Sequence, residues 1–208
     1  MREGASMKKM ILTAFSILVS ASAFASTERF VVDPKSSEIQ WVGTKVLVKD
    51  AHTGTIDLKD GYLEVINGDL SKADFIVKMN TIAVTDIKNP KDSAKLKGHL
   101  ESEDFFDSAK FPEARLEITG SKKISSGGTH EISGILTIKG HSEKITFPAT
   151  IKTESSKLSL IASLPVDRTK FKVKFGSKQF FENLVGNRII SDTFDLKVNL
   201  VASAQKKK

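Results

Sequence analysis

Residues 129–171 alternate between apolar and polar side chains in three successive runs, and this alternation limits the possible folds more than any other feature. The apolar positions are Ile132, Leu136 and Ile138, then Ile145, Phe147, Ala149 and Ile151, then Leu158, Leu160, Ala162, Leu164 and Val166. A period of two is typical of a β-strand with one buried face. Short polar breaks at 139–142 and 153–156 predict hairpin turns. The three runs therefore predict an antiparallel meander whose apolar face is covered.

Similar alternation recurs along most of the chain. It predicts strands over 73–81, 113–120 and 188–202, and a strand over 38–48 that is covered on both faces for part of its length. Turn residues at 59–61 predict a hairpin within 52–66. With about eight or nine one-faced strands, the chain can bury its apolar face by closing into a barrel or by stacking as a sandwich.

Two segments depart from the strand pattern. Pro90 is followed by good helix formers, and Leu96 and Leu100 have helical spacing, which predicts a short helix that ends before Asp104. Residues 178–185 are expected to form a second short helix or a loop packed on the sheet.

The first 25 residues have the pattern of an export signal. Lys8 and Lys9 precede the apolar run 10–19, and small residues follow at Ala23 and Ala25. We therefore expect a signal peptide over 1–25 with cleavage after Ala25, and an exported protein that is periplasmic or secreted. The apolar run is shorter than the roughly 20 residues that span a bilayer. We expect a single domain over 26–202, a basic flexible tail over 203–208 and no transmembrane segment in the mature chain.

Composition excludes several classes of function. The sequence has no cysteine, which excludes disulfides, thiol catalysis and cysteine metal sites. The formal charge is +7, but the signal contributes two of those charges and Lys206, Lys207 and Lys208 contribute three. The remaining excess of +2 alternates with acidic residues and has few aromatic neighbours, so we expect no nucleic-acid partner.

Catalytic and metal-binding patterns are weak. The histidines His52, His99, His130 and His141 are scattered, and none has the spacing of a helical zinc site. We expect His130 and His141 to be exposed. A metal site formed by His52, His99 and a carboxylate stays open as a minor alternative. We predict no enzyme activity, no catalytic residue and no cofactor.

Several separated motifs resemble one known family. They are GHLESEDFFDSAKFPEARLEIT over 98–119, GILTIKGHSEKITFPA over 134–149 and PVDRTKF over 165–171, with Trp41, His52 and Gly54 before them. In this order they resemble the YceI-like family of exported polyisoprenoid-binding proteins, from about Arg29 to Ala202. The resemblance implies an all-β, lipocalin-like, eight-stranded antiparallel barrel with one or two short helices, whose interior holds a long isoprenoid or a similar amphiphile. It implies a lipid-binding carrier or store and not an enzyme.

The inward face of such a barrel would be the ligand site. We predict a barrel lining of twelve residues: Phe75, Val77, Met79, Leu116, Ile118, Leu136, Ile138, Phe147, Leu160, Leu164, Phe194 and Leu196. Candidates to hold a polar head group at the mouth are His99, Asp104, Arg115 and Arg168. Phe105 and Phe106 are expected to plug the barrel or pin the helix.

The function prediction is a soluble exported carrier or store of a long-chain isoprenoid, such as a quinone tail or polyprenyl chain, or of a fatty amphiphile. One alternative is a solid-core β-sandwich that acts as an interaction or surface protein, and a weaker one is a metalloenzyme or hydrolase. Leu136→Trp distinguishes the first two, because it would block a hollow barrel but unfold a packed core. The sequence leaves open whether the chain forms a homodimer.

Overall fold

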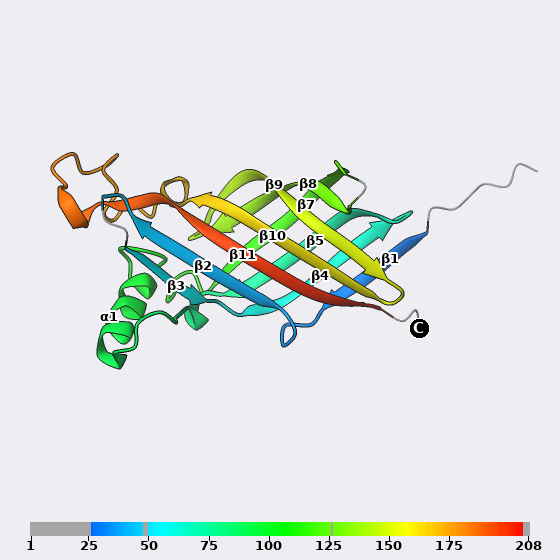
Figure 1. The fold of residues 1–208 in the computed structure, drawn as a ribbon, viewed down its shortest axis with the longest axis horizontal. Coiled ribbons are helices and arrows are strands. Elements are labelled where there is room, and N and C mark those ends of the chain that lie inside the picture. Colours follow the sequence, from blue (N-terminus) through cyan, green and yellow to red (C-terminus); the bar gives the residue numbers. More distant parts are fainter. Residues whose placement is uncertain (1–25, 48–49, 126, 206–208) are drawn as a thin grey trace, which may run out of the picture.

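The computed structural model describes residues 26–47, 50–125 and 127–205, in which eight antiparallel strands close into an elongated barrel (Figure 1). In ring order the strands are β1 (Thr27–Val32), β4 (Leu58–Ile66), β5 (Asp69–Lys78), β7 (Glu113–Lys123), β8 (Thr129–Ile138), β9 (His141–Glu154), β10 (Lys157–Asp167) and β11 (Ile190–Ala204). The ring closes because β1 pairs with both β4 and β11. Closure leaves each of these strands a partner on both sides. The predicted barrel is thus confirmed, and the sandwich alternative is wrong.

A smaller extension covers one end of the barrel. β2 (Glu38–Lys45) pairs with β11 between Ile190 and Asn199, whereas β1 pairs with the last residues of β11. β3 (Ala51–Thr55) pairs with β2, and the two-residue β6 (Ala83–Val84) pairs with β3. The helix α1 (Pro90–Glu101) lies at the same end, with the Asn89 side chain accepting a hydrogen bond from the Lys91 N–H. This agrees with the predicted helix. We call this the helix end, and the opposite one, where both described chain ends lie, the terminal end (Figure 1).

The predicted hairpin over 52–66 is wrong. β3 pairs with β2, and residues 59–61 lie inside β4, where Gly61 pairs with Phe75. A Cβ on Gly61 would lie 2.7 Å from the Phe75 ring, so this glycine permits a close approach between strands and does not make a turn.

Two further expectations concern single segments. Of the two forms expected for residues 178–185, the structure shows the loop, which is followed by a short 3-10 helix at Gly186–Arg188. His130, expected to be exposed, is buried, with Nδ1 2.8 Å from the carbonyl oxygen of Gly128. His141 is exposed as expected.

The two ends of the barrel are filled differently. At the terminal end large apolar side chains form a packed core, with Phe30, Leu63 and Ile132 at 0% exposure and Leu158 at 1%. None of these four borders the cavity described below. The terminal end is therefore tightly packed, whereas the helix end contains the cavity.

Some sequence predictions fall at or beyond the edges of this description. β11 continues to Ala204, so the first two residues of the predicted tail pair within the sheet. The predicted signal over 1–25, its cleavage site after Ala25 and the lysines 206–208 lie outside the described residues. In the described part of the chain, no helix is long and apolar enough to cross a bilayer.

Candidate ligand cavity

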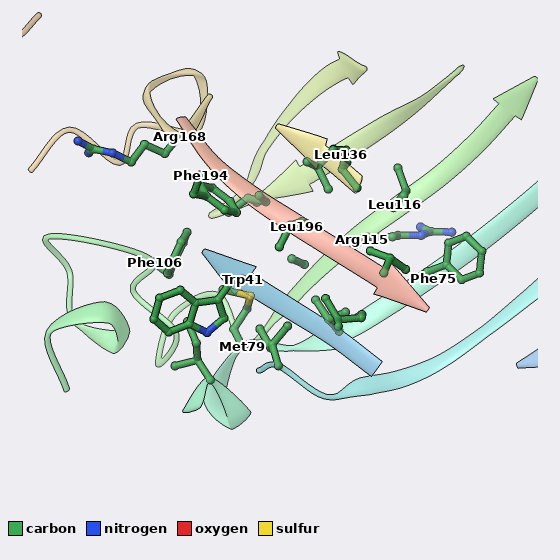
Figure 2. A pocket seen from close by; sticks show the side chains of 18 of the residues that line it. Trp41, Phe75, Met79, Phe106, Arg115, Leu116, Leu136, Arg168, Phe194 and Leu196 are labelled. Carbon is green, nitrogen blue, oxygen red and sulfur yellow. The ribbon is translucent and has the colours of Figure 1, made fainter. Parts of the chain in front are cut away.

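An elongated cavity of about 170 Å³ occupies the helix end of the barrel, and apolar side chains make up nearly all of its wall (Figure 2). All twelve residues predicted to line the barrel border it: Phe75, Val77, Met79, Leu116, Ile118, Leu136, Ile138, Phe147, Leu160, Leu164, Phe194 and Leu196. They come from β5, β7, β8, β9, β10 and β11 and the 3-10 turn Met79–Thr81. The alternation that buries one face of each strand brings these side chains around one axis.

The burial of the inward residues confirms that the middle is hollow. Val77, Leu116, Leu196 and Val198 border the cavity, yet they are only partly buried. Leu160 and Ile118, deeper in the barrel, are each 3% exposed. The free surface of the first group faces the cavity and not a neighbouring side chain. An apolar cavity of this size stays dry and accepts apolar guests, since one of about 150 Å³ binds benzene.

The cavity is long and narrow. On β11 alone, every second residue from Phe194 to Leu200 borders it, a stretch of about 20 Å at about 3.3 Å per residue. A volume of 170 Å³ spread over such a length forms a slim lane. Its shape suits a single flexible chain better than a bulky ring system.

Aromatic side chains narrow the lane at the helix end. Trp41, Phe106 and Phe194 border it there (Figure 2), and Phe105 is also part of its wall. The Phe105 and Phe106 ring centroids lie 6.1 Å apart, as do those of Phe106 and Phe194. Trp41 is anchored, because its Nε1–H donates to the Ala83 carbonyl oxygen at 3.1 Å. Phe105 is 7% exposed, which fits the expected plug.

Arg168 lies at this end with its charge buried, its side chain being 3% exposed. Its guanidinium donates to three backbone carbonyls, those of Ser191 at 2.8 Å, Val173 at 2.8 Å and Ile190 at 3.2 Å. Burial lowers the pKa of Arg168, whereas the nearby carboxylates of Asp192 and Asp167 raise it. The guanidinium remains protonated, because arginine does not lose its proton in proteins. Arg168 therefore ties the segment after β10 to the start of β11 and frames the mouth.

Two other head-group candidates lie beside the same aromatic cluster. The His99 ring packs edge-on against Phe105 at 5.0 Å and Phe175 at 4.5 Å between centroids. Its Nε2 is 3.7 Å from Oδ2 of Asp104, which is 66% exposed. The Arg168 guanidinium carbon lies 5.9 Å from the centroid of the same Phe105 ring. His99, Asp104 and Arg168 thus gather around Phe105.

Arg115 does not join them. Its neighbours Ala114 and Leu116 point inward, so its side chain projects from the outer wall, where Nε donates to Asp74 Oδ1 at 2.9 Å. Glu117 lies 3.3 Å away on the same face. The hydrogen bond with Asp74 raises the pKa of Arg115. Arg115 also borders the cavity, but its charge is paired with Asp74 and Glu117, so it remains a prediction as a head-group contact and enters no proposal below.

The metal-site alternative gains no support. Within residues 26–47, 50–125 and 127–205, no three His, Asp or Glu side chains are arranged to hold a metal ion. His52 Nδ1 lies 2.9 Å from Asp86 Oδ2, and His99 faces Asp104, so neither histidine contacts the other.

Sequence reasoning missed part of the lining. Leu58, Ile82 and Leu100 line the cavity without being predicted, as do Trp41 and the polar Ser191 and Thr193. Trp41 could have been predicted from the period of two, because it follows Ile39 by two residues on the same strand and both residues line the cavity. Ile82 and Leu100 lie outside the barrel strands, so no strand period marks them.

Comparison with known proteins assigns the fold to a described family. A family model described as the YceI-like domain matches residues 30–202. BcnA of Burkholderia cenocepacia has a similar structure, with a TM-score of 0.66 and 20% identity over 83% of this chain and 99% of BcnA. The YCEI protein of Campylobacter jejuni matches with a TM-score of 0.52 and 18% identity over 97% and 100% of the two chains. At these identities the structural likeness shows the fold alone. No curated protein matches the chain.

Proposed function

The chain belongs to the YceI-like family, and from this premise we propose that it is an exported carrier or store of a long-chain isoprenoid, such as a quinone tail or polyprenyl chain, or of a similar amphiphilic lipid. The observation that carries the proposal is the narrow, almost wholly apolar cavity at the helix end of a barrel whose other end is solidly packed. A cavity lined this way offers burial to a chain but few groups for catalysis. We accordingly propose a binding protein and not an enzyme.

Burial alone supplies enough free energy for useful affinity. Each CH₂ removed from water contributes about 0.8 kcal/mol, so eight to ten carbons contribute about 6 to 8 kcal/mol. Ordering a flexible chain removes part of this. Since few directional contacts are available in the lane, binding selects mainly for the length and slimness of the apolar chain.

The polar head of such a ligand would stay at the helix end. Three of the five Arg168 donors are used by the backbone carbonyls of Val173, Ile190 and Ser191, and one of its nitrogens also lies 3.5 Å from Asp192. His99 is 34% exposed and lies beside the Phe105 plug. We therefore expect His99 to contact the head group and Arg168 to position the loop around it.

Export is part of the same proposal. The basic, apolar and small-residue pattern over 1–25 supports removal of a signal after Ala25. Protein purified from the periplasm of its host should begin at Ser26 when its N-terminus is sequenced. A purified chain that keeps residues 1–25 would contradict this part of the proposal.

The ligand is tested on protein purified from its own host. Native mass spectrometry and solvent extraction should find a tightly bound apolar chain. Leu136→Trp places an indole in the lane and should abolish retention of the molecule, with only modest loss of stability. The matched control is Ile135→Trp on the outward face of the same strand, which should retain it. Repeated absence of any apolar molecule from the unchanged protein would overturn the proposal.

A further inference from the structure

Most of the exposed large apolar side chains in the described part of the chain lie at one end of the molecule. Of the nine large hydrophobic residues that are exposed in the described part of the chain, six lie in two segments at the helix end. We call these six the loop-end patch: Val46, Leu47, Phe175, Phe180, Phe181 and Val185. The two segments are neighbours, because the Val46 N–H donates to the Ile189 carbonyl oxygen at 3.1 Å. An exposed apolar cluster of this kind marks a surface that meets a partner.

Positive charge accompanies this patch. Between residues 170 and 188 the chain carries Lys170, Lys172, Lys174, Lys178 and Arg188 against the single acid Glu182. This segment thus has an excess of four positive charges, whereas the chain between the predicted signal and the terminal lysines has an excess of only two. The rest of that region is therefore net acidic. Lys174 Nζ lies 4.5 Å from the Phe180 ring centroid, so cationic and aromatic groups share one surface.

The loop-end patch is continuous with the cavity. Phe175, a member of the patch, packs edge-on against His99, and His99 packs against Phe105, which lines the lane. Figure 1 shows residues 170–189 and α1 projecting from the same end of the barrel, away from both described chain ends. The remaining three exposed residues, Val31 on β1, Ile124 after β7 and Ile161 on β10, come from separate elements of the barrel.

We propose that the loop-end patch docks on the surface of an anionic phospholipid bilayer. This inference rests on the proposed function, because docking would bring the mouth at Phe105 and Phe106 against the membrane in which an apolar chain resides. Aromatic and aliphatic side chains enter the interfacial layer, and the surrounding lysines remain among the lipid phosphates. Charge complementarity selects this partner. An uncharged apolar partner would gain nothing from the positive excess.

The size of the charge effect can be anticipated. A lysine close to an anionic membrane surface strengthens binding about fivefold, and the effect falls off within a Debye length of about 10 Å at 0.1 M salt. Two lysines at the surface therefore account for about 25-fold in affinity. Binding should weaken steeply as salt is raised.

The first test measures co-sedimentation of the purified protein with vesicles. Vesicles of phosphatidylethanolamine with phosphatidylglycerol should bind it, and vesicles of phosphatidylcholine alone should bind it at least tenfold more weakly. The double variant Phe180→Ser with Phe181→Ser should lose at least tenfold in affinity, because 40% and 50% of these side chains are exposed and available to the membrane. Ile161→Ser, an exposed apolar residue on the barrel wall, is the matched control and should bind as the unchanged protein does.

The second test reverses charge. Lys170→Glu with Lys178→Glu should reduce binding to anionic vesicles by more than 25-fold. Lys152→Glu with Lys157→Glu makes the same change in net charge with exposed lysines at the terminal end, where Lys157 pairs with Ser203, and should reduce binding far less. Equal losses in the two pairs would overturn the proposal, since binding would then depend on net charge alone.

Other outcomes separate docking from ligand carriage. If the protein retains an extractable apolar molecule but does not bind anionic vesicles, the docking proposal is wrong and the carrier function is still supported. If the protein binds vesicles through the patch but never contains an apolar molecule, the carrier function is wrong and the docking proposal is still supported. If the serine variant changes a dimer into a monomer by sedimentation, and vesicles do not bind, the patch is a contact between two copies and the membrane proposal is wrong.

Discussion

Arg168 carries a buried positive charge that is compensated by backbone from two other segments. Its partners are the carbonyls of Val173, Ile190 and Ser191, five to 23 residues away in sequence. Hydrogen bonds from a charged donor are stronger than neutral ones, and a buried carbonyl that loses its donor costs free energy. Arg168 therefore holds together the loops that frame the mouth.

Replacing Arg168 should be costly. We expect Arg168→Gln to lower the free energy of unfolding in urea by about 3 kcal/mol, because these three carbonyls lose their charged donor. Arg168→Lys should restore little, since one ammonium cannot reach three separate carbonyls. The control is Arg115→Gln on the outer wall, where an exposed ion pair is worth less than about 1 kcal/mol. Equal costs at the two positions would contradict the role given to Arg168.

The carboxyl group of Asp86 makes the free energy of unfolding depend on pH in the acid range. Burial acts to raise the pKa of Asp86, but hydrogen bonds from His52 and from the Thr53 N–H outweigh it, so the pKa lies below its ordinary value of 3.8. A carboxyl group with a depressed pKa in the folded state stabilises the protein fully above the ordinary value. As the pH falls, the unfolded chain binds the proton first, so this contribution is lost below pH 3.8.

The test compares urea midpoints of the unchanged protein and Asp86→Asn between pH 5 and pH 3. The unchanged protein should lose more stability across that interval, because only it has this carboxyl group to protonate. The variant should be the less stable of the two at pH 7. Parallel pH dependences would show that Asp86 is not the group responsible.

Strand β3 packs against the cavity-lining residue Trp41 through Gly54. Gly54 pairs with Trp41 of β2 on one side and with Val84 of β6 on the other. A Cβ at Gly54 would lie 1.7 Å from the Ala83 carbonyl oxygen and 2.5 Å from the Trp41 ring. That carbonyl is also the acceptor for the indole N–H. The absence of a side chain thus sets both the β3–β6 contact and the position of Trp41.

Gly54→Ala should disrupt this arrangement. We expect a loss of at least about 3 kcal/mol in the free energy of unfolding, since backbone must move to accept the methyl group. Trp41 is the chain's single tryptophan, so its displacement should shift the fluorescence of the protein to longer wavelength. The control is Gly98→Ala on the exposed face of α1, which has no atom within 4 Å of the added Cβ. That change should stabilise by about 1 kcal/mol and leave the fluorescence unchanged.

At the scale of the whole molecule, the barrel combines a packed terminal end with a hollow helix end. Phe30 and Leu63 are fully buried at the first, while Leu196 and Val198 remain partly exposed to the cavity at the second. Packing at the terminal end stabilises the barrel without contribution from the cavity. The helix end can then hold a lane that would be unstable if it were the entire core.

Replacing one leucine at each end by alanine measures how differently the two ends are packed. Leu158→Ala at the terminal end should cost about 3 to 5 kcal/mol in the free energy of unfolding, because it opens a void in a solid core. Leu196→Ala in the lane should cost about 2 kcal/mol or less, because that side chain already borders empty space. Denaturant unfolding of both variants decides the matter. Equal costs would mean that the helix end is packed as tightly as the terminal end.

The amino-acid sequence by itself determined which side chains of the barrel strands face inward. That property is local, since a period of two along one strand assigns each residue to a face, and all twelve predicted lining residues border the cavity. The helix after Pro90 was predictable for a similar reason, because a proline at the first turn and the spacing of Leu96 and Leu100 are properties of a few neighbouring residues.

Only the tertiary structure decided the rest. Gly61 has the same sequence signature in a turn as in a strand, and its role depends on the Phe75 ring across the strand pair. The pairing of Arg115 with Asp74 and the hydrogen bonds from Arg168 to the start of β11 are contacts between segments that no local period connects. Whether eight apolar faces fill their shared interior or leave a lane depends on how side-chain volumes from all the strands add up across the barrel, and that sum exists only once the ring has closed.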